Sequence, residues 1–193
     1  MSLAKSKSLQ LLEILFVVLS FSSCSSGYTP KPMGYFRIDL HEKEYANSEN
    51  NVPYSFEYPS NIAKIVPHKK NPLWVDVVYP EYNARIYCSY MPIQDNLYDI
   101  SEDSREFVYK HAIKADAITQ QPFENADTHV YGVLYEIKGN AASSIQFTLT
   151  DSTNHYFRAA LYFNNKPNND SIAPVLAYIR EDIVRMMETM EWK

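Results

Sequence analysis

Apolar and polar side chains alternate with a period of two along much of the chain, which is the pattern of a β-strand with one buried face. Tyrosine, phenylalanine, isoleucine and valine dominate these stretches, and all four are enriched in strands. The expected strands are residues 35–40, 55–58, 63–66, 74–79, 84–91, 130–137, 144–149 and 156–163. Short turn sequences at 138–140 and 151–154 join the last three strands, so we expect these three to pair antiparallel.

Two segments follow a helical period instead. Asp103 and Glu106 have the spacing of a capping box at a helix N-terminus, and the apolar face that follows predicts a helix through about Ala117. Near the C-terminus, apolar residues recur every four positions, which predicts a helix with Ser171 as its cap and Pro174 in its first turn. The residues of this apolar stripe are Val175, Ile179, Ile183 and Met187.

The order of these elements predicts the α+β class, with a twisted antiparallel sheet flanked by a mid-chain helix and a C-terminal helix. Apolar residues on both faces of several strands indicate that helices or loops cover both faces of the sheet. This order is similar to the small α/β sandwich of the photosystem extrinsic subunit PsbP. The similarity concerns the fold alone and implies no shared function.

The N-terminal region has the order of a secretory signal, with positive residues, an apolar stretch and small residues. Lys5 and Lys7 precede the apolar residues 9–21, which are too few for a membrane-spanning helix of about 20 residues. Two serines then precede Cys24, an order that resembles the lipobox of bacterial lipoproteins. The resemblance implies that the chain is cut before Cys24 and that its thiol is acylated, with palmitate among the acyl groups. The alternative is an ordinary cleavable signal with a chance cysteine.

We therefore expect three parts: a signal peptide over residues 1–23, a lipidated cysteine with an extended tether over 24–33, and a single globular α+β domain over 34–193. Pro30 and Pro32 favour extended chain in the tether. The composition, 46% hydrophobic and 21% charged, is that of a globular protein.

The charge and the remaining cysteine narrow the function further. The net charge of −5 argues against a nucleic-acid partner, for which a basic face is the expected footprint. Cys88 is the second of the two cysteines, and the alternation places it on a strand, where we expect it to be a small buried apolar residue.

Sequence patterns that carry catalysis or bind cofactors are missing. The chain has neither a nucleophile elbow nor a phosphate-binding glycine loop. Its histidines, at positions 41, 68, 111, 129 and 155, lack the spacing of metal ligands. We therefore expect no catalytic residue, cofactor or metal ion, unless histidines and carboxylates gather in one cleft as in a hydrolase. Acidic pairs such as Glu181 with Asp182 are expected on solvated helix faces.

Two separated stretches resemble the gliding motility lipoprotein GldD family of Bacteroidota. The first is KPMGYFRIDL at 31–40, where the following His41 departs from the expected proline. The second begins with RAALYF at 158–163 and continues, with gaps, to Trp192 and Lys193. The resemblance covers essentially the whole mature chain. It implies an envelope lipoprotein tied to gliding motility and type IX secretion, and it brings no catalytic residues.

The motif positions of this resemblance are the candidate docking residues. They are Tyr35, Arg37, Asp39, Arg158, Asn168 and Asp170. One interpretation is a docking surface anchored by Arg37 and Arg158, because arginine is enriched at interface hot spots. In the other, Arg37 and Asp39 form internal ion pairs, while Asn168 and Asp170 shape the loop before the last helix.

The sequence thus predicts a non-enzymatic lipoprotein of the cell envelope, lipid-anchored and facing the periplasm. We expect it to act as a scaffold or assembly factor, with other gliding and secretion envelope proteins as partners and the membrane as its anchor. The alternative function is a glycan- or peptide-binding envelope module, which predicts a concave pocket lined with tyrosines.

Overall fold

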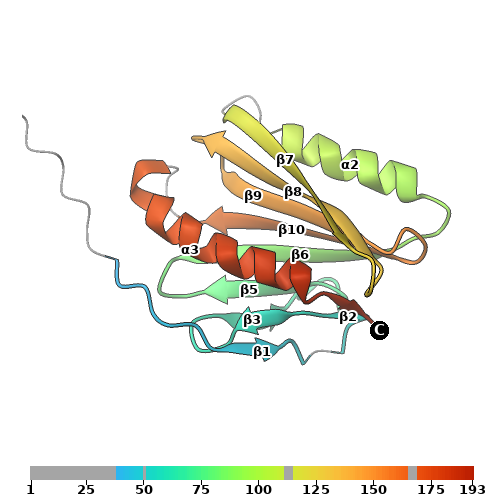
Figure 1. Cartoon of the computed structure of the whole chain (residues 1–193), viewed down its shortest axis with the longest axis horizontal. Coiled ribbons are helices and arrows are strands. Elements are labelled where there is room, and N and C mark those ends of the chain that lie inside the picture. Colours follow the sequence, from blue (N-terminus) through green and yellow to red (C-terminus); the bar gives the residue numbers. More distant parts are fainter. Residues whose placement is uncertain (1–37, 50, 111–114, 165–168) are drawn as a thin grey trace, which may run out of the picture. The chain divides into compact units, whose positions relative to one another are not determined.

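A seven-stranded antiparallel sheet forms the centre of the fold (Figure 1). This computed structural model describes residues 38–49, 51–110, 115–164 and 169–193, which fall within one compact unit, Arg37–Lys193. The strand order is β4-β5-β6-β10-β9-β8-β7, and every neighbouring pair is antiparallel. The bounds are β4 Lys64–Pro67, β5 Val75–Tyr79, β6 Ala84–Pro92, β7 Ala115–Asn125, β8 Val130–Gly139, β9 Ser143–Thr150 and β10 His155–Phe163.

Two small two-stranded sheets pair the first and the last strand of this unit with the same short segment, Tyr54 to Pro59. Strand β1 (Tyr45–Asn47) pairs with β3 (Glu57–Pro59), and the C-terminal strand β11 (Glu191–Trp192) pairs with β2 (Tyr54–Ser55). Between β2 and β3 stands Phe56, which is fully buried. The segment that we expected as one strand, 55–58, is therefore two short strands with different partners.

Helices α2 (Leu97–Tyr109) and α3 (Asn169–Glu188) cover opposite faces of the large sheet. Strand β8 shows the division, because Leu134 belongs to the core that contains α3, whereas Tyr135 and Ile137 pack with Val108 of α2. Adjacent strand residues point to opposite faces. An antiparallel sheet with one mid-chain and one C-terminal helix confirms the predicted α+β class.

The larger core lies between α3 and the sheet. The predicted apolar stripe is confirmed, because Val175, Ile179, Ile183 and Met187 are all buried. Their partners from the sheet include Phe147, Phe157 and Leu161, all almost fully buried. Burial of such side chains is the main favourable contribution to folding, at about 1.5–3 kcal/mol each.

Helix α2 differs from the expected mid-chain helix at both ends. It begins at Leu97, so Asp103 lies in its interior rather than at its cap. The spacing of Asp103 and Glu106 also occurs on exposed helix faces, where such residues form pairs with neighbours one turn away. The helix ends at Tyr109, and the expected continuation to Ala117 is wrong because strand β7 already includes that residue.

Two other sequence-based boundaries are also wrong. Ser171, the expected cap, lies inside α3, which begins at Asn169. The described part of the first expected strand, Ile38 to Leu40, is not a strand, and the first strand begins at Tyr45. Side chains rather than a strand ladder satisfy the backbone there, as described below.

The turn between β9 and β10 is organised by one carboxylate. Asp151 Oδ1 accepts hydrogen bonds from the backbone N–H groups of Thr153 (3.0 Å), Asn154 (2.8 Å) and His155 (2.8 Å). Partial burial by itself would raise the pKa of Asp151, but these N–H donors outweigh it and lower the pKa to about 2. The folded state therefore favours the ionised form.

Replacing Asp151 by alanine is expected to lower the free energy of unfolding by about 1 kcal/mol at neutral pH, because three N–H donors lose their acceptor. Since the folded pKa is depressed below its usual 3.8, this contribution is complete above about pH 4 and is lost as the pH falls through about 2. Urea unfolding at several pH values measures this. Asp151→Asn, which keeps one acceptor oxygen, serves as the control and should lose less. A loss that is the same at low and neutral pH would contradict this explanation.

Candidate functional site

The segment from Ile38 to Glu44 is held against the domain by side chains. Asn61 donates from Nδ2 to the carbonyl of Glu42 (2.8 Å), and its Oδ1 accepts from the backbone N–H of Glu44 (3.0 Å). Tyr82 donates its hydroxyl to the carbonyl of Asp39 (3.3 Å). These bonds take the place of a strand ladder, so the segment is fixed although it forms no sheet.

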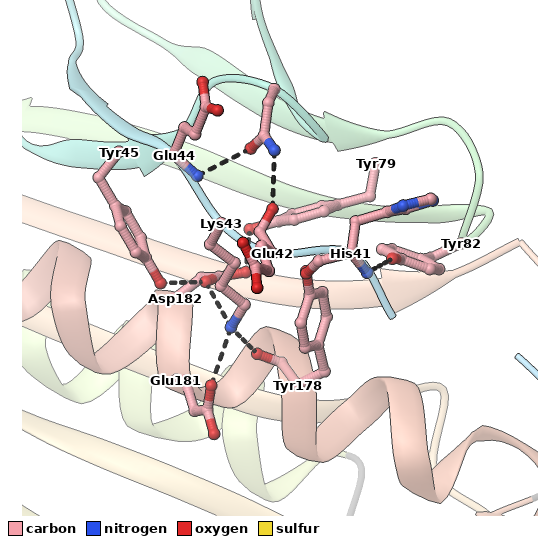
Figure 2. Close-up of polar contacts among 11 residues, drawn as sticks. His41, Glu42, Lys43, Glu44, Tyr45, Tyr79, Tyr82, Tyr178, Glu181 and Asp182 are labelled. Atoms are coloured by element: carbon pink, nitrogen blue, oxygen red, sulfur yellow. Dashed lines mark hydrogen bonds and ion pairs between the residues drawn. The ribbon is translucent and has the colours of Figure 1, made fainter. Parts of the chain in front are cut away.

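The strongest attachment of this segment is an ion pair with helix α3 (Figure 2). Lys43 Nζ lies 2.8 Å from Asp182 Oδ1 and 3.0 Å from Glu181 Oε2, and it donates to the carbonyl of Tyr178 (2.7 Å). The same ammonium stands 3.9 Å from the centre of the Tyr178 ring, a cation–π contact. All three donors of the ammonium are therefore engaged on α3.

Two tyrosines complete the environment of the Asp182 carboxylate. Tyr45 donates its hydroxyl to Oδ1 (2.7 Å) and Tyr79, on β5, donates to Oδ2 (3.2 Å). We call Lys43, Tyr45, Tyr79 and Asp182 the Lys43 clamp. It joins the N-terminal segment, the sheet and α3 through one carboxylate, and each carboxylate oxygen accepts at least one hydrogen bond.

Burial governs the electrostatics of the clamp. It raises the pKa of Asp182, whose exposed fraction is 0%, while the hydrogen bonds and charge of Lys43 and the tyrosine hydroxyls pull that pKa back down. Burial and the neighbouring Asp182 carboxylate raise the pKa values of Tyr45 and Tyr79. Both hydroxyls therefore stay protonated at neutral pH and act as donors. These contacts give the clamp a structural role, holding the N-terminal segment on the domain.

The sequence-based interpretation of Glu181 and Asp182 as a solvated pair is wrong for Asp182. The Glu181 side chain is 72% exposed, whereas that of Asp182 is completely buried. The helical spacing contained the signal, because Asp182 stands three residues after Ile179 and four before Met186, both fully buried. Residues at these spacings share one helix face. An acidic residue on an apolar stripe requires a buried partner, which Lys43 provides.

A second polar feature lies on the sheet face opposite α3. There α2 packs over β8, and the part of the same face formed by β5, β6 and β10 carries a hollow of about 370 Å³. Its lining includes Trp74, Asp76, Tyr87, Arg158 and Tyr162. Tyr87 and Tyr162 meet edge to face with ring centres 5.5 Å apart. Trp74, Tyr87 and Tyr162 thus contribute three aromatic rings to a lining that also contains charged, polar and small side chains.

Arg158 connects this hollow to α2. Its guanidinium lies 4.4 Å from the centre of the Phe107 ring and donates from Nη2 to Gln146 Oε1 (3.1 Å). Burial lowers the pKa of Arg158, which nevertheless keeps its charge because free arginine titrates above about 12. At the far side of the hollow Asp76 is paired with Arg85 at 2.9 Å.

The structure places only some of the predicted docking residues. Tyr35, Arg37 and Asn168 lie outside the described residues, as does the lipidation candidate Cys24, and Asp170 stands in the first turn of α3 with its side chain undescribed. Asp39 is exposed on the α3 side of the sheet, where its carbonyl meets Tyr82, whereas Arg158 lines the hollow on the other side. The two described motif residues are therefore not brought together.

Three of the four described histidines have separate side-chain contacts. His41 pairs with Glu81 (2.9 Å), His155 with the Tyr90 hydroxyl (2.8 Å), and His68 packs beside Trp74. Within the described ranges, no group of three or more histidine, cysteine, aspartate or glutamate side chains has the geometry of a metal site. Cys88 is buried on β6, as predicted.

No helix in the described part of the chain is both long and apolar enough to cross a membrane. A comparison with curated proteins gave no match. A family model described as gliding motility lipoprotein GldD matches residues 25–192, a range that includes the clamp, the hollow and the C-terminal strand. Because this match covers most of the sequence, the chain belongs to the gliding motility lipoprotein GldD family, which associates it with the cell envelope and with gliding motility.

Proposed function

We propose that this protein is a non-enzymatic lipoprotein that is anchored through Cys24, faces the periplasm, and serves as a scaffold or assembly factor for envelope proteins of gliding motility and type IX secretion. The observation that supports a docking role is the Arg158 surface, which we define as Arg158, Phe107, Tyr87 and Tyr162. Phe107 is 45% exposed and Tyr87 is 42% exposed; Arg158 contacts the Phe107 ring and lines the same hollow as Tyr87.

The composition of this surface is that of a protein interface. Tyrosine and arginine are enriched at the residues that dominate binding energy, and large exposed aromatic side chains gain most from being covered. Two of the four residues, Arg158 and Tyr162, belong to the RAALYF stretch that carries the family resemblance. Tyr35, Arg37, Asp39, Asn168 and Asp170 remain candidates for a separate contact.

Replacing Arg158 by glutamine is expected to reduce co-purification of envelope partners about tenfold or more, because truncating a central interface arginine costs at least about 1.4 kcal/mol. The measurement is affinity purification from detergent-solubilised envelopes, with quantified partner yield. Arg105→Gln is the matched control, because Arg105 is exposed on α2 and only pairs with Glu102 at 2.6 Å. Cys24→Ala tests the anchor in the same experiment.

Two results would contradict this proposal, the first its scaffold function and the second its docking surface. One is that the wild-type protein is recovered without specific partners. The other is that Arg158→Gln retains its partners at wild-type yield, which would remove the Arg158 surface from the interface. Melting temperatures of each variant show whether a loss reflects unfolding instead.

A second candidate function is a ligand-binding module, and the hollow favours it because concave sites lined by aromatic side chains with a few polar groups are typical of ligand pockets. A ligand selective for the folded protein raises its melting temperature by mass action. Thermal shifts with neutral oligosaccharides test this function, since aromatic walls stack on sugar rings. An unchanged melting temperature at saturating sugar would argue against a glycan module.

A further inference from the structure

Arg158 differs from the other arginines in the described part of the chain. Four of the five have a carboxylate within ion-pair distance: Arg85 with Asp76, Arg105 with Glu102, Arg180 with Glu136 and Arg185 with Glu57, at 2.6–2.9 Å. Arg158 has no carboxylate partner among the described residues. Burial lowers the pKa of Arg158, whereas carboxylate partners raise the pKa values of Arg105 and Arg185, so Arg158 is desolvated without a neutralising partner.

The guanidinium of Arg158 is held ready for an anion. A guanidinium carries five N–H donors in a planar fork, and the structure commits one, through Nη2, to Gln146. The Phe107 ring lies against the guanidinium, with its centre 4.4 Å from Cζ. A side chain fixed in this way loses little conformational entropy when a carboxylate binds in a bidentate manner. Little of the binding free energy is therefore lost to ordering the arginine.

The other side chains around the hollow determine which groups of a ligand can bind next to the anion. Asp76 is neutralised by Arg85, so these three charged side chains leave one net positive charge in a chain whose overall charge is −5. Ser89 donates its hydroxyl to the Arg158 carbonyl (3.3 Å), and Tyr87 and Tyr162 supply apolar ring surface. The site therefore offers one cationic position beside an aromatic wall that extends outward to the exposed Phe107.

These features favour a protein segment over a free anion or an acidic sugar. An anion alone would use Arg158 but leave the exposed rings of Tyr87 and Phe107 uncovered, and a sugar acid would place hydroxyl groups against them. The hollow lies over β5, β6 and β10, each of which already has a strand on both sides. A bound segment therefore contacts the site through its side chains and does not add a strand to the sheet.

We propose that the hollow receives an acidic segment of a protein partner, whose aspartate or glutamate carboxylate binds Arg158 while a neighbouring apolar side chain covers Tyr87 and Phe107. This proposal rests on the proposed scaffold function, since it specifies the chemistry of the partner that docks on the Arg158 surface.

Trp74 makes the proposal measurable, because it lines the hollow and is one of only two tryptophans in the chain. In the full chain in detergent, Trp192→Phe leaves Trp74 as the sole tryptophan reporter. The probes are a short acetylated peptide that alternates glutamate with leucine, the same peptide with lysine in place of glutamate, and trigalacturonate as an acidic sugar. The glutamate peptide is expected to change the fluorescence of Trp74 in a saturable manner. Added salt is expected to lower the affinity of the peptide, because it screens the attraction between the carboxylate and Arg158.

Arg158→Gln is expected to lower the affinity for the glutamate peptide about tenfold or more, whereas Arg105→Gln should leave that affinity unchanged. Tyr87→Ala, on the exposed ring, is a second variant and should weaken the peptide without removing the charge. The proposal is overturned if the glutamate peptide does not bind, if Arg158→Gln binds it equally well, or if trigalacturonate binds and the peptide does not.

The outcome is separable from that of the scaffold function. In one outcome, Arg158→Gln loses its envelope partners but the wild-type chain binds no peptide. This outcome would support the scaffold function and overturn the proposal that the hollow binds an acidic segment. Peptide binding that depends on Arg158, with no partner recovered from envelopes, would keep the acidic segment as a ligand and overturn the scaffold.

Discussion

Replacing Lys43 by methionine is expected to lower the free energy of unfolding by about 3 kcal/mol at neutral pH. Methionine keeps most of the apolar stem but removes the cation 2.8 Å from Asp182, so the fully buried carboxylate loses its counter-charge. Removing one partner of a buried ion pair typically costs about 3–5 kcal/mol, mainly because the other charge remains in a poorly solvated place. Urea unfolding followed by circular dichroism measures the loss.

The matched control is Lys110→Met. Lys110 is exposed and pairs with Glu106 at 3.2 Å, one helical turn away. Surface pairs of this kind contribute about 0.5 kcal/mol or less. A loss at Lys43 no larger than at Lys110 would mean that the clamp does not stabilise the fold.

The pH dependence identifies the cause of the loss. Burial raises the pKa of Asp182 even with Lys43 present, so the folded state binds its proton more tightly than the unfolded state. For such a group, stability falls as the pH rises from the unfolded pKa of about 3.8 through the folded pKa. Without Lys43 the folded pKa rises further, so the stability difference between Lys43→Met and wild type should shrink as the pH is lowered from neutral toward the unfolded pKa of about 3.8.

The double variant Lys43→Met with Asp182→Asn should recover part of the loss, because a neutral amide needs no counter-charge. Its oxygen can still accept from one of the hydroxyls of Tyr45 and Tyr79, and its NH2 group can donate to the other. A gap that does not change with pH, or a double variant that is no better than the single one, would assign the loss to packing of the lysine stem. Charge would then not be the reason for the clamp.

The Lys43 clamp also lies on the connection between the proposed lipid anchor and the domain. The proposed lipid anchor at Cys24 precedes the segment that Lys43 and Tyr45 fix to α3 and β5. A pull on the anchor would enter the domain through this segment, and the buried ion pair lies between that point and the large sheet. A scaffold that holds partners on one sheet face needs its anchored end fixed in this way.

The local features of the fold follow from the sequence, and the long-range ones do not. The meander β8-β9-β10 was predicted because strict alternation and short turns act between neighbouring residues. The pairing of β10 with β6, such as Ala159 opposite Cys88, joins residues far apart in sequence and carries no local signal. The same holds for Lys43 and Asp182, whose partnership depends on how the N-terminal segment crosses α3.

The candidate site shows the same limit. Alternation on β10 places Arg158 on the face opposite Phe157, and the family resemblance marks its position. That it lines a hollow depends on α2, which begins at Leu97, packs over β8 and leaves the face of β5, β6 and β10 open. The sequence pattern does not show which strands α2 covers, so it does not predict the hollow.

Replacing Gly132 by alanine is expected to destabilise the fold by about 3 kcal/mol, at the upper end of the usual cost of overpacking. A Cβ atom at Gly132 on β8 would lie 1.9 Å from the backbone oxygen of Thr148 and 2.8 Å from a methyl group of Leu149 on β9. The first contact is with backbone and no side-chain rotation relieves it. The two strands would have to move apart where β9 is paired on both sides.

Gly139→Ala separates this collision from ordinary glycine strain. Gly139 has a φ of 105° at the end of β8, a conformation that L side chains rarely adopt and that costs alanine about 1–2 kcal/mol. We expect urea unfolding to show a loss at Gly132 well above that at Gly139, because a displaced strand affects the cores on both faces of the sheet. Equal losses would mean that β8 and β9 separate easily at this point. Strand β8, over which α2 packs, would then adapt more readily than the close approach at Gly132 indicates.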